Sequence, residues 1–151
     1  AKWDDIDFDN AIWNCPEDNM KSGKFFRIPL SEFAMKIINS QKKHSKGEYI
    51  FGHEQTGKMS SNNCMLYTIY RMGYQGKVTT HGMRSTMRDW AGETTKYSER
   101  IVEVCLDHTV NTAAESAYQR GDYLAKRREI MDGWGRFCYP SENKVIHIRK
   151  R

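Results

Sequence analysis

Extended and helical patterns occupy separate parts of this chain, and that separation is the strongest constraint on its fold. Within the first 30 residues, Trp3, Ile6 and Phe8 roughly alternate with acidic residues, and Asp9-Asn10 reads as a turn. A hairpin tip is expected at residues 21–24, followed by a return strand at residues 25–29. The remainder reads as helices. The sequence therefore predicts an α+β fold, with a small antiparallel three-stranded sheet followed by a mainly helical body.

Helix starts and apolar spacing define the expected helical body. Ser31 begins the first helix, which runs to about Lys43, and Thr79 or Thr80 caps another. A polar loop with a short extended piece separates the first two helices. Gly133, Gly135 and Pro140 are expected to end regular structure. The helix after Thr79 or Thr80 is expected over residues 81–91, and further helices over residues 63–72, 98–105, 111–118 and 122–134. Residues 1–30, 31–136 and 137–151 would then form the sheet, the helical body and a basic tail of one domain.

Composition places the chain among globular proteins. Its 151 residues, 38% hydrophobic, suffice for one core, and no apolar run approaches the ~18 residues of a membrane helix. The four cysteines are scattered without paired spacing, which favours a reduced, cytoplasmic compartment. Position 1 is Ala rather than Met, so we expect a piece of a longer protein.

The net charge of +5 suggests a polyanionic partner, although a solvated surface explains a charge of this size equally well. The same two interpretations hold for the basic residues that could contact a DNA backbone. These candidates are Lys24, Lys42, Lys43, Arg88, Arg120, Lys126 and Arg127.

Four residues in a fixed order carry the chemistry. His81 and Arg84 are three apart, so they lie on one face of a helix, and they are followed by His108 and Tyr118. Arginine offers a permanently charged fork that suits phosphate oxygens, and a tyrosine hydroxyl can act as a nucleophile. Each residue alone has an ordinary explanation as an ion pair, a helix cap or a buried aromatic. Together they supply what an attack on a DNA phosphate requires.

Several segments resemble the tyrosine recombinases, the phage integrase family. His81-Gly82-Met83-Arg84 resembles the family's His-x-x-Arg box, Leu106-Asp107-His108 its Leu-x-His box, and Ala117-Tyr118-Gln119-Arg120 its nucleophile box. The similarity covers residues 3–134 and is greatest to integrases of prophages and genomic islands. Residues 3–8 resemble the first catalytic-domain strand, and residues 20–23 with 27–31 resemble the hairpin that carries the catalytic lysine.

The resemblance implies a role for each site residue. Tyr118 would attack the scissile phosphate, while Arg84 and His108 would hold its oxygens. His81 would position the tyrosine or accept its proton, and Lys21 would protonate the leaving 5′ oxygen. No metal and no other cofactor is implied. Cys105 and His108 could share a metal, but no second pair stands at ligand spacing.

One departure concerns a second arginine, which the family carries on a helix upstream of its first strand. No arginine precedes Arg27, and Arg27 lies on the return strand, so it does not match. We therefore expect that the chain starts downstream of that helix, lacks the amino-terminal domain, and is nearly inactive alone.

The resemblance also implies partners. These are double-stranded DNA attachment sites, a DNA-bridged homotetramer of the full-length protein and an excisionase-type directionality factor, in a bacterial or phage-encoded protein associated with the nucleoid. The alternatives are a non-catalytic DNA-binding remnant of an integrase and a nicking-closing enzyme of the type IB topoisomerase kind.

Overall fold

The computed structural model describes residues 1–20, 22–108 and 121–140. Three short antiparallel strands form one sheet in the order β1 (Ile6–Asp7), β2 (Ile12–Cys15) and β3 (Phe26–Pro29). Trp13 of β2 pairs with Ile6 on one side and with Ile28 on the other. The expected three-stranded sheet and the pairing of the hairpin strands are confirmed.

The first strand is shorter than its alternating pattern indicated. Trp3–Asp5 forms a 3-10 turn, and only Ile6–Asp7 pairs with β2. The Asp5 carboxylate accepts a hydrogen bond from the Lys2 backbone N–H at 3.0 Å. Such a local side-chain bond competes with a strand ladder.

Five helices follow among the described residues, and two of them begin with the hydroxyl cap that the sequence indicated. The Ser31 hydroxyl accepts from the Ala34 N–H at 3.2 Å, and the Thr79 hydroxyl accepts from the Gly82 N–H at 2.9 Å. These bonds satisfy N–H groups that the first turn of a helix leaves unpaired. The helices are α1 (Glu32–Gln41), α2 (Cys64–Arg71), α3 (Thr80–Thr94), α4 (Glu99–Cys105) and α6 (Leu124–Cys138).

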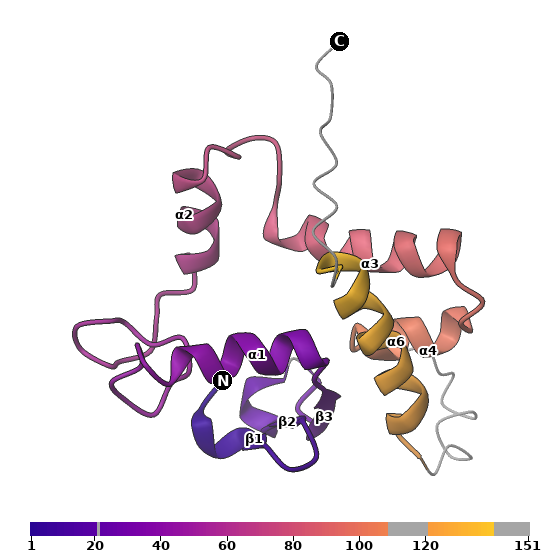
Figure 1. The fold of residues 1–151 in the computed structure, drawn as a ribbon, viewed down its shortest axis with the longest axis horizontal. Coiled ribbons are helices and arrows are strands. Elements are labelled where there is room, and N and C mark those ends of the chain that lie inside the picture. The colour runs from indigo at the N-terminus through magenta and orange to yellow at the C-terminus, as the bar shows by residue number, and fades with distance from the viewer. Residues whose placement is uncertain (21, 109–120, 141–151) are drawn as a thin grey trace.

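Two apolar clusters form the core, and α6 lies between them. One cluster joins the sheet to α1 through Ile6, Ile38 and Ile50. The other joins α3, α4 and α6, and Figure 1 shows these three helices grouped together beside the sheet and α1. Because α6 also contacts β3 and α1, it connects the two halves. The second cluster contains Met87, Ala91, Val102, Leu106 and Ile130.

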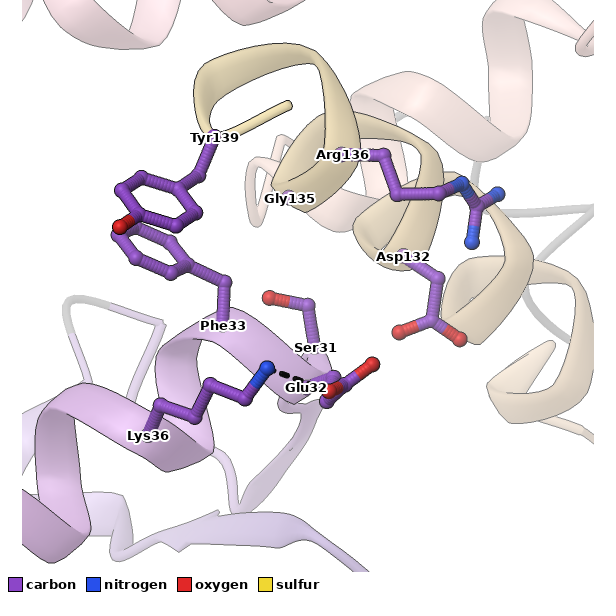
Figure 2. Close-up of a pocket in the computed structure, with 8 residues that line it drawn as sticks. All are labelled: Ser31, Glu32, Phe33, Lys36, Asp132, Gly135, Arg136 and Tyr139. Atoms are coloured by element: carbon purple, nitrogen blue, oxygen red, sulfur yellow. Dashed lines mark ion pairs between the residues drawn. The ribbon is translucent and has the colours of Figure 1, made fainter. Parts of the chain in front are cut away.

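Helix α6 extends beyond its expected end. Gly133 and Gly135 do not terminate it, and it continues to Cys138, so that expectation is wrong. The glycines serve close packing instead. A Cβ on Gly135 would lie 2.7 Å from the Ser31 hydroxyl oxygen, and one on Gly133 would lie 3.1 Å from the Trp90 ring. Figure 2 shows Gly135 facing Ser31 where α6 packs against the start of α1, beside the stacked rings of Phe33 and Tyr139.

One substitution at two helical glycines should have opposite effects. Gly92→Ala, where an added Cβ meets nothing within 4 Å, should stabilise the protein by about 0.5 kcal/mol through helix propensity. Gly135→Ala should destabilise it by about 1 kcal/mol or more, because the strain of overpacking, about 1–3 kcal/mol, exceeds the propensity gain. Chemical denaturation of both variants checks the signs. A stabilised Gly135→Ala variant would contradict the packing role of this glycine.

Helix α2 is less buried than its apolar spacing suggested. Ile69 is buried, but Met65 and Met72 are 56% and 65% exposed. Figure 1 shows α2 standing apart from α3, α4 and α6, in agreement with the exposure of most of its apolar side chains. None of the helices within the described ranges has both the length and the hydrophobicity needed to cross a membrane.

Candidate active site

His81 and Arg84 lie on the first turn and a half of α3. The Thr79 cap starts this helix, so His81 is its second residue and Arg84 lies one turn further on. Both side chains are exposed, whereas Met87 and Ala91 of the same helix are buried in the core. The spacing that predicted a shared face is confirmed, since the whole segment is helical.

Arg84 connects α3 to the end of α4. Its Nη2 group donates a hydrogen bond to the backbone carbonyl of Leu106, two residues before His108. That bond uses one of the five N–H donors of a guanidinium, so several remain for phosphate oxygens. Leu106 itself is buried against α3 and α6, which fixes the position of this carbonyl.

His108 is placed by the turn that ends α4. The His108 N–H donates to the carbonyl of Glu103 at 3.0 Å, and the Asp107 N–H donates to Val104 at 3.1 Å. Asp107 adopts a left-handed conformation with φ of 53°. This is the Schellman arrangement, which usually has glycine at that position but also tolerates Asn and Asp. The turn therefore brings His108 to the end of α4, close to the carbonyl that holds Arg84.

Glu103 was not identified from the sequence, yet it contacts two of the candidate residues. Its Oε2 atom lies 2.5 Å from Nδ1 of His108, and its Oε1 atom lies 2.5 Å from Nε of Arg88. The hydrogen bond from His108 and the positive charge of Arg88 lower the pKa of Glu103, although partial burial opposes them. The carboxylate is therefore ionised at neutral pH. The only sequence signal was an acidic residue between two valines of α4.

Two of the five expected catalytic residues, Tyr118 and Lys21, lie outside the described residues. An ion pair joins described residues that follow each of them in the chain, however. Arg27 of β3 forms an ion pair with Asp122, four residues after Tyr118, through Nη2 and Oδ2 at 2.9 Å. Arg27, which the sequence left without a catalytic role, thus ties the return strand of the hairpin to the start of α6.

The candidate DNA-contacting residues separate into exposed and engaged ones. Lys24, Lys42, Lys43 and Lys126 are exposed, and the Lys42 ammonium lies 4.2 Å from the centre of the Phe8 ring. Arg88 is exposed but paired with Glu99 and Glu103. Arg120 lies outside the described residues.

Arg127 is the exception, because its side chain is only 1% exposed. Its guanidinium donates to the carbonyls of Asp122, at 3.1 Å, and Arg27, and it lies 4.2 Å from the centre of the Phe26 ring. The expectation that Arg127 reaches a DNA phosphate is therefore wrong. The helix turns this residue inward, between two cationic neighbours that are more exposed.

Comparison with known proteins places the chain in a family. The profile of the Phage integrase family matches residues 1–123. The prophage integrase IntA of Escherichia coli is 31% identical over 99% of this chain and 37% of its own length. The integrase of Enterobacteria phage P4 is 30% identical over 98% of this chain and 38% of its own length.

A third relative, the integrase of Shigella phage Sf6, is 28% identical over 88% of this chain and 35% of its own length. The chain thus spans little more than a third of these relatives. No solved structure matches it. The profile covers the α3 and α4 boxes together with the sheet, and the chain belongs to the phage integrase family, the tyrosine recombinases.

Proposed function

We propose that the protein containing this chain is a site-specific DNA recombinase that integrates or excises a mobile element. In the proposed reaction the Tyr118 oxygen attacks the scissile phosphorus and forms a phosphotyrosine bond to the 3′ end. The bond to the 5′ oxygen breaks, Lys21 gives that oxygen a proton, and His81 positions the tyrosine or takes its proton. Attack by a 5′ hydroxyl reverses these steps. The phosphodiester energy is retained in the phosphotyrosine bond, so rejoining consumes no ATP.

The observation that carries this proposal is the junction between α3 and α4. There, Arg84 donates to the carbonyl of Leu106, and His108 follows two residues later on a turn closed by two backbone hydrogen bonds. A guanidinium and an imidazole are thus supported by packed helices rather than by a long loop. Such preorganised donors stabilise the charge that develops on a phosphate in the transition state.

The rest of the site and the assembly form part of the same proposal. We infer that the full-length protein supplies a second phosphate-binding arginine upstream of residue 1, so the 151-residue chain alone should be nearly inactive. Removal of one preorganised donor typically costs about 10²-fold or more in rate. The partners in this proposal are double-stranded attachment sites, three further copies bridged by DNA, and a directionality factor.

A covalent-adduct assay tests the function. The full-length protein, incubated with nicked duplex DNA from the element's own boundary, should form a protein–DNA adduct that survives denaturant. Tyr118→Phe should abolish that adduct, because phenylalanine has no nucleophilic oxygen. Tyr123→Phe, at the next tyrosine along the chain, is the matched control and should retain it.

Other outcomes of this assay would favour one of the alternative functions or another nucleophile. DNA binding without any adduct would contradict the enzymatic proposal and indicate a DNA-binding remnant. An adduct that persists in Tyr118→Phe would place the nucleophile elsewhere. Adduct formation with relaxation of supercoils but no strand exchange between two attachment sites would indicate a nicking-closing enzyme.

A further inference from the structure

We propose that Glu103 is the positioning residue for His108, fixing which nitrogen of its imidazole carries a proton and which faces the DNA phosphate. That the ligand of His108 is a DNA phosphate rests on the function proposed above. The orientation of the ring does not, because it follows from contacts within the chain.

Glu103 holds His108 at two points. Its backbone carbonyl accepts from the His108 N–H at 3.0 Å, and its Oε2 atom lies 2.5 Å from Nδ1 of the ring. The Glu103 side chain is only 13% exposed, whereas that of His108 is 48% exposed. A partly buried carboxylate therefore fixes one edge of the imidazole and leaves Nε2 as the nitrogen available to a ligand.

The carboxylate determines what Nε2 can do. An ionised carboxylate only accepts hydrogen bonds, so the proton must lie on Nδ1 of His108. In the neutral ring Nε2 then carries a lone pair and cannot donate to a phosphate oxygen. In the charged ring both nitrogens carry protons, and Nε2 donates while Glu103 balances the positive charge. With Nδ1 held by Glu103, donation from Nε2 to a phosphate oxygen therefore requires the imidazolium form of the ring.

Charged groups of both signs, from α3, α4 and the turn after α4, surround this pair. From α3, Arg88 lies 2.5 Å from Oε1 of Glu103, and Arg84 donates to the adjacent Leu106 carbonyl. From α4 and the turn after it come Glu99, which pairs with Arg88, and Asp107. A purely structural role for Glu103, as an ion pair that joins α4 to Arg88, is the competing explanation.

The protonated nitrogen can be measured directly. In the full-length protein labelled with ¹⁵N in its histidines, the ring nitrogen shifts at alkaline pH report which nitrogen of the neutral imidazole carries the proton. His108→Gln identifies the signals. We expect the proton on Nδ1 in the wild type and in Glu103→Gln, whose amide oxygen still accepts, and on Nε2 in Glu103→Ala. A wild-type ring protonated on Nε2, or no change in Glu103→Ala, would overturn the proposal.

A kinetic measurement separates a positioning role of Glu103 from a purely structural role as an ion pair with Arg88. Glu103→Ala should slow single-turnover adduct formation about 10-fold with little change in DNA affinity, as for carboxylates that orient metal-binding histidines. Glu99→Ala, which removes a partner of Arg88 from the same helix but no contact of His108, should leave the rate unchanged. Equal losses of rate in the two variants would favour the purely structural ion pair and contradict the positioning role.

The two proposals fail separately. If the wild type forms no adduct, the proposed function fails, while the ring nitrogen shifts still decide the role of Glu103. If the adduct forms and the wild-type proton lies on Nε2, only the role of Glu103 fails.

Discussion

Replacing Arg127 with alanine should lower the free energy of unfolding by about 3 kcal/mol or more. The guanidinium is 1% exposed and donates to the carbonyls of Asp122 and Arg27. Truncation leaves both acceptors without this donor and opens a cavity beneath the Phe26 ring. The same change removes the contacts of Arg127 with the Arg27 carbonyl and the Phe26 ring, which join β3 to α6. Chemical denaturation of the purified variant measures the loss.

Lys126 provides the matched control for this experiment. It is the preceding residue on α6, it is exposed, and its ammonium lies 6.0 Å from the centre of the Tyr123 ring. Lys126→Ala should change the unfolding free energy by no more than about 0.5 kcal/mol. If it contacts a phosphate, it should also weaken DNA binding and reduce the dependence of binding on salt. A stability loss in Arg127→Ala no larger than that of the control would show that the buried guanidinium is not structural.

The basic run at residues 126–128 shows where prediction from the sequence stops. Consecutive residues of a helix point in different directions, so one member of a charge run can face inward while its neighbours stay more exposed. Burial of an arginine requires acceptors, and those for Arg127 include a carbonyl of β3, 100 residues earlier. That pairing is tertiary, and no local pattern reveals it.

Helix starts could be predicted from the sequence where the stabilising hydrogen bond joins residues of the same helical turn. Ser31 and Thr79 start helices because each hydroxyl bonds a backbone N–H within its own first turn, which the sequence alone displays. Gly133 and Gly135 misled for the opposite reason. Glycine lowers helix propensity by only about 1 kcal/mol, and the packing of α6 against Trp90 and Ser31 outweighs that cost.

The candidate site divides in the same way. The spacing of His81 and Arg84 is a property of one helix, so their shared face could be predicted. The contact between Glu103 and His108 depends on the turn after α4, where Asp107 takes a left-handed conformation without glycine. The Arg84 bond to Leu106 requires α3 to pack against α4. Sequence order predicted the candidate reactive groups, and only the packed structure shows what orients Arg84 and His108 among them.

Replacing Arg84 with alanine in the full-length protein should slow adduct formation by about 10²- to 10³-fold, with a much smaller change in DNA affinity. The guanidinium is preorganised by the Leu106 carbonyl, so it can meet the charge that builds up on the phosphate without rearranging. DNA affinity, by contrast, is spread over many backbone contacts. Single-turnover adduct formation and a binding titration at fixed salt measure the two quantities.

Two further variants make this test specific to Arg84. Arg84→Lys retains the charge but loses the planar fork, so most of the rate loss should remain. Arg71 is an exposed arginine of α2 that donates a hydrogen bond to the Thr68 hydroxyl of the same helix. Arg71→Ala should leave the rate of adduct formation unchanged. If lysine restored the rate, positive charge alone would account for the contribution of Arg84. If Arg84→Ala weakened DNA binding as much as it slowed cleavage, Arg84 would act in ground-state binding rather than on the transition state, because only interactions stronger in the transition state accelerate the chemical step.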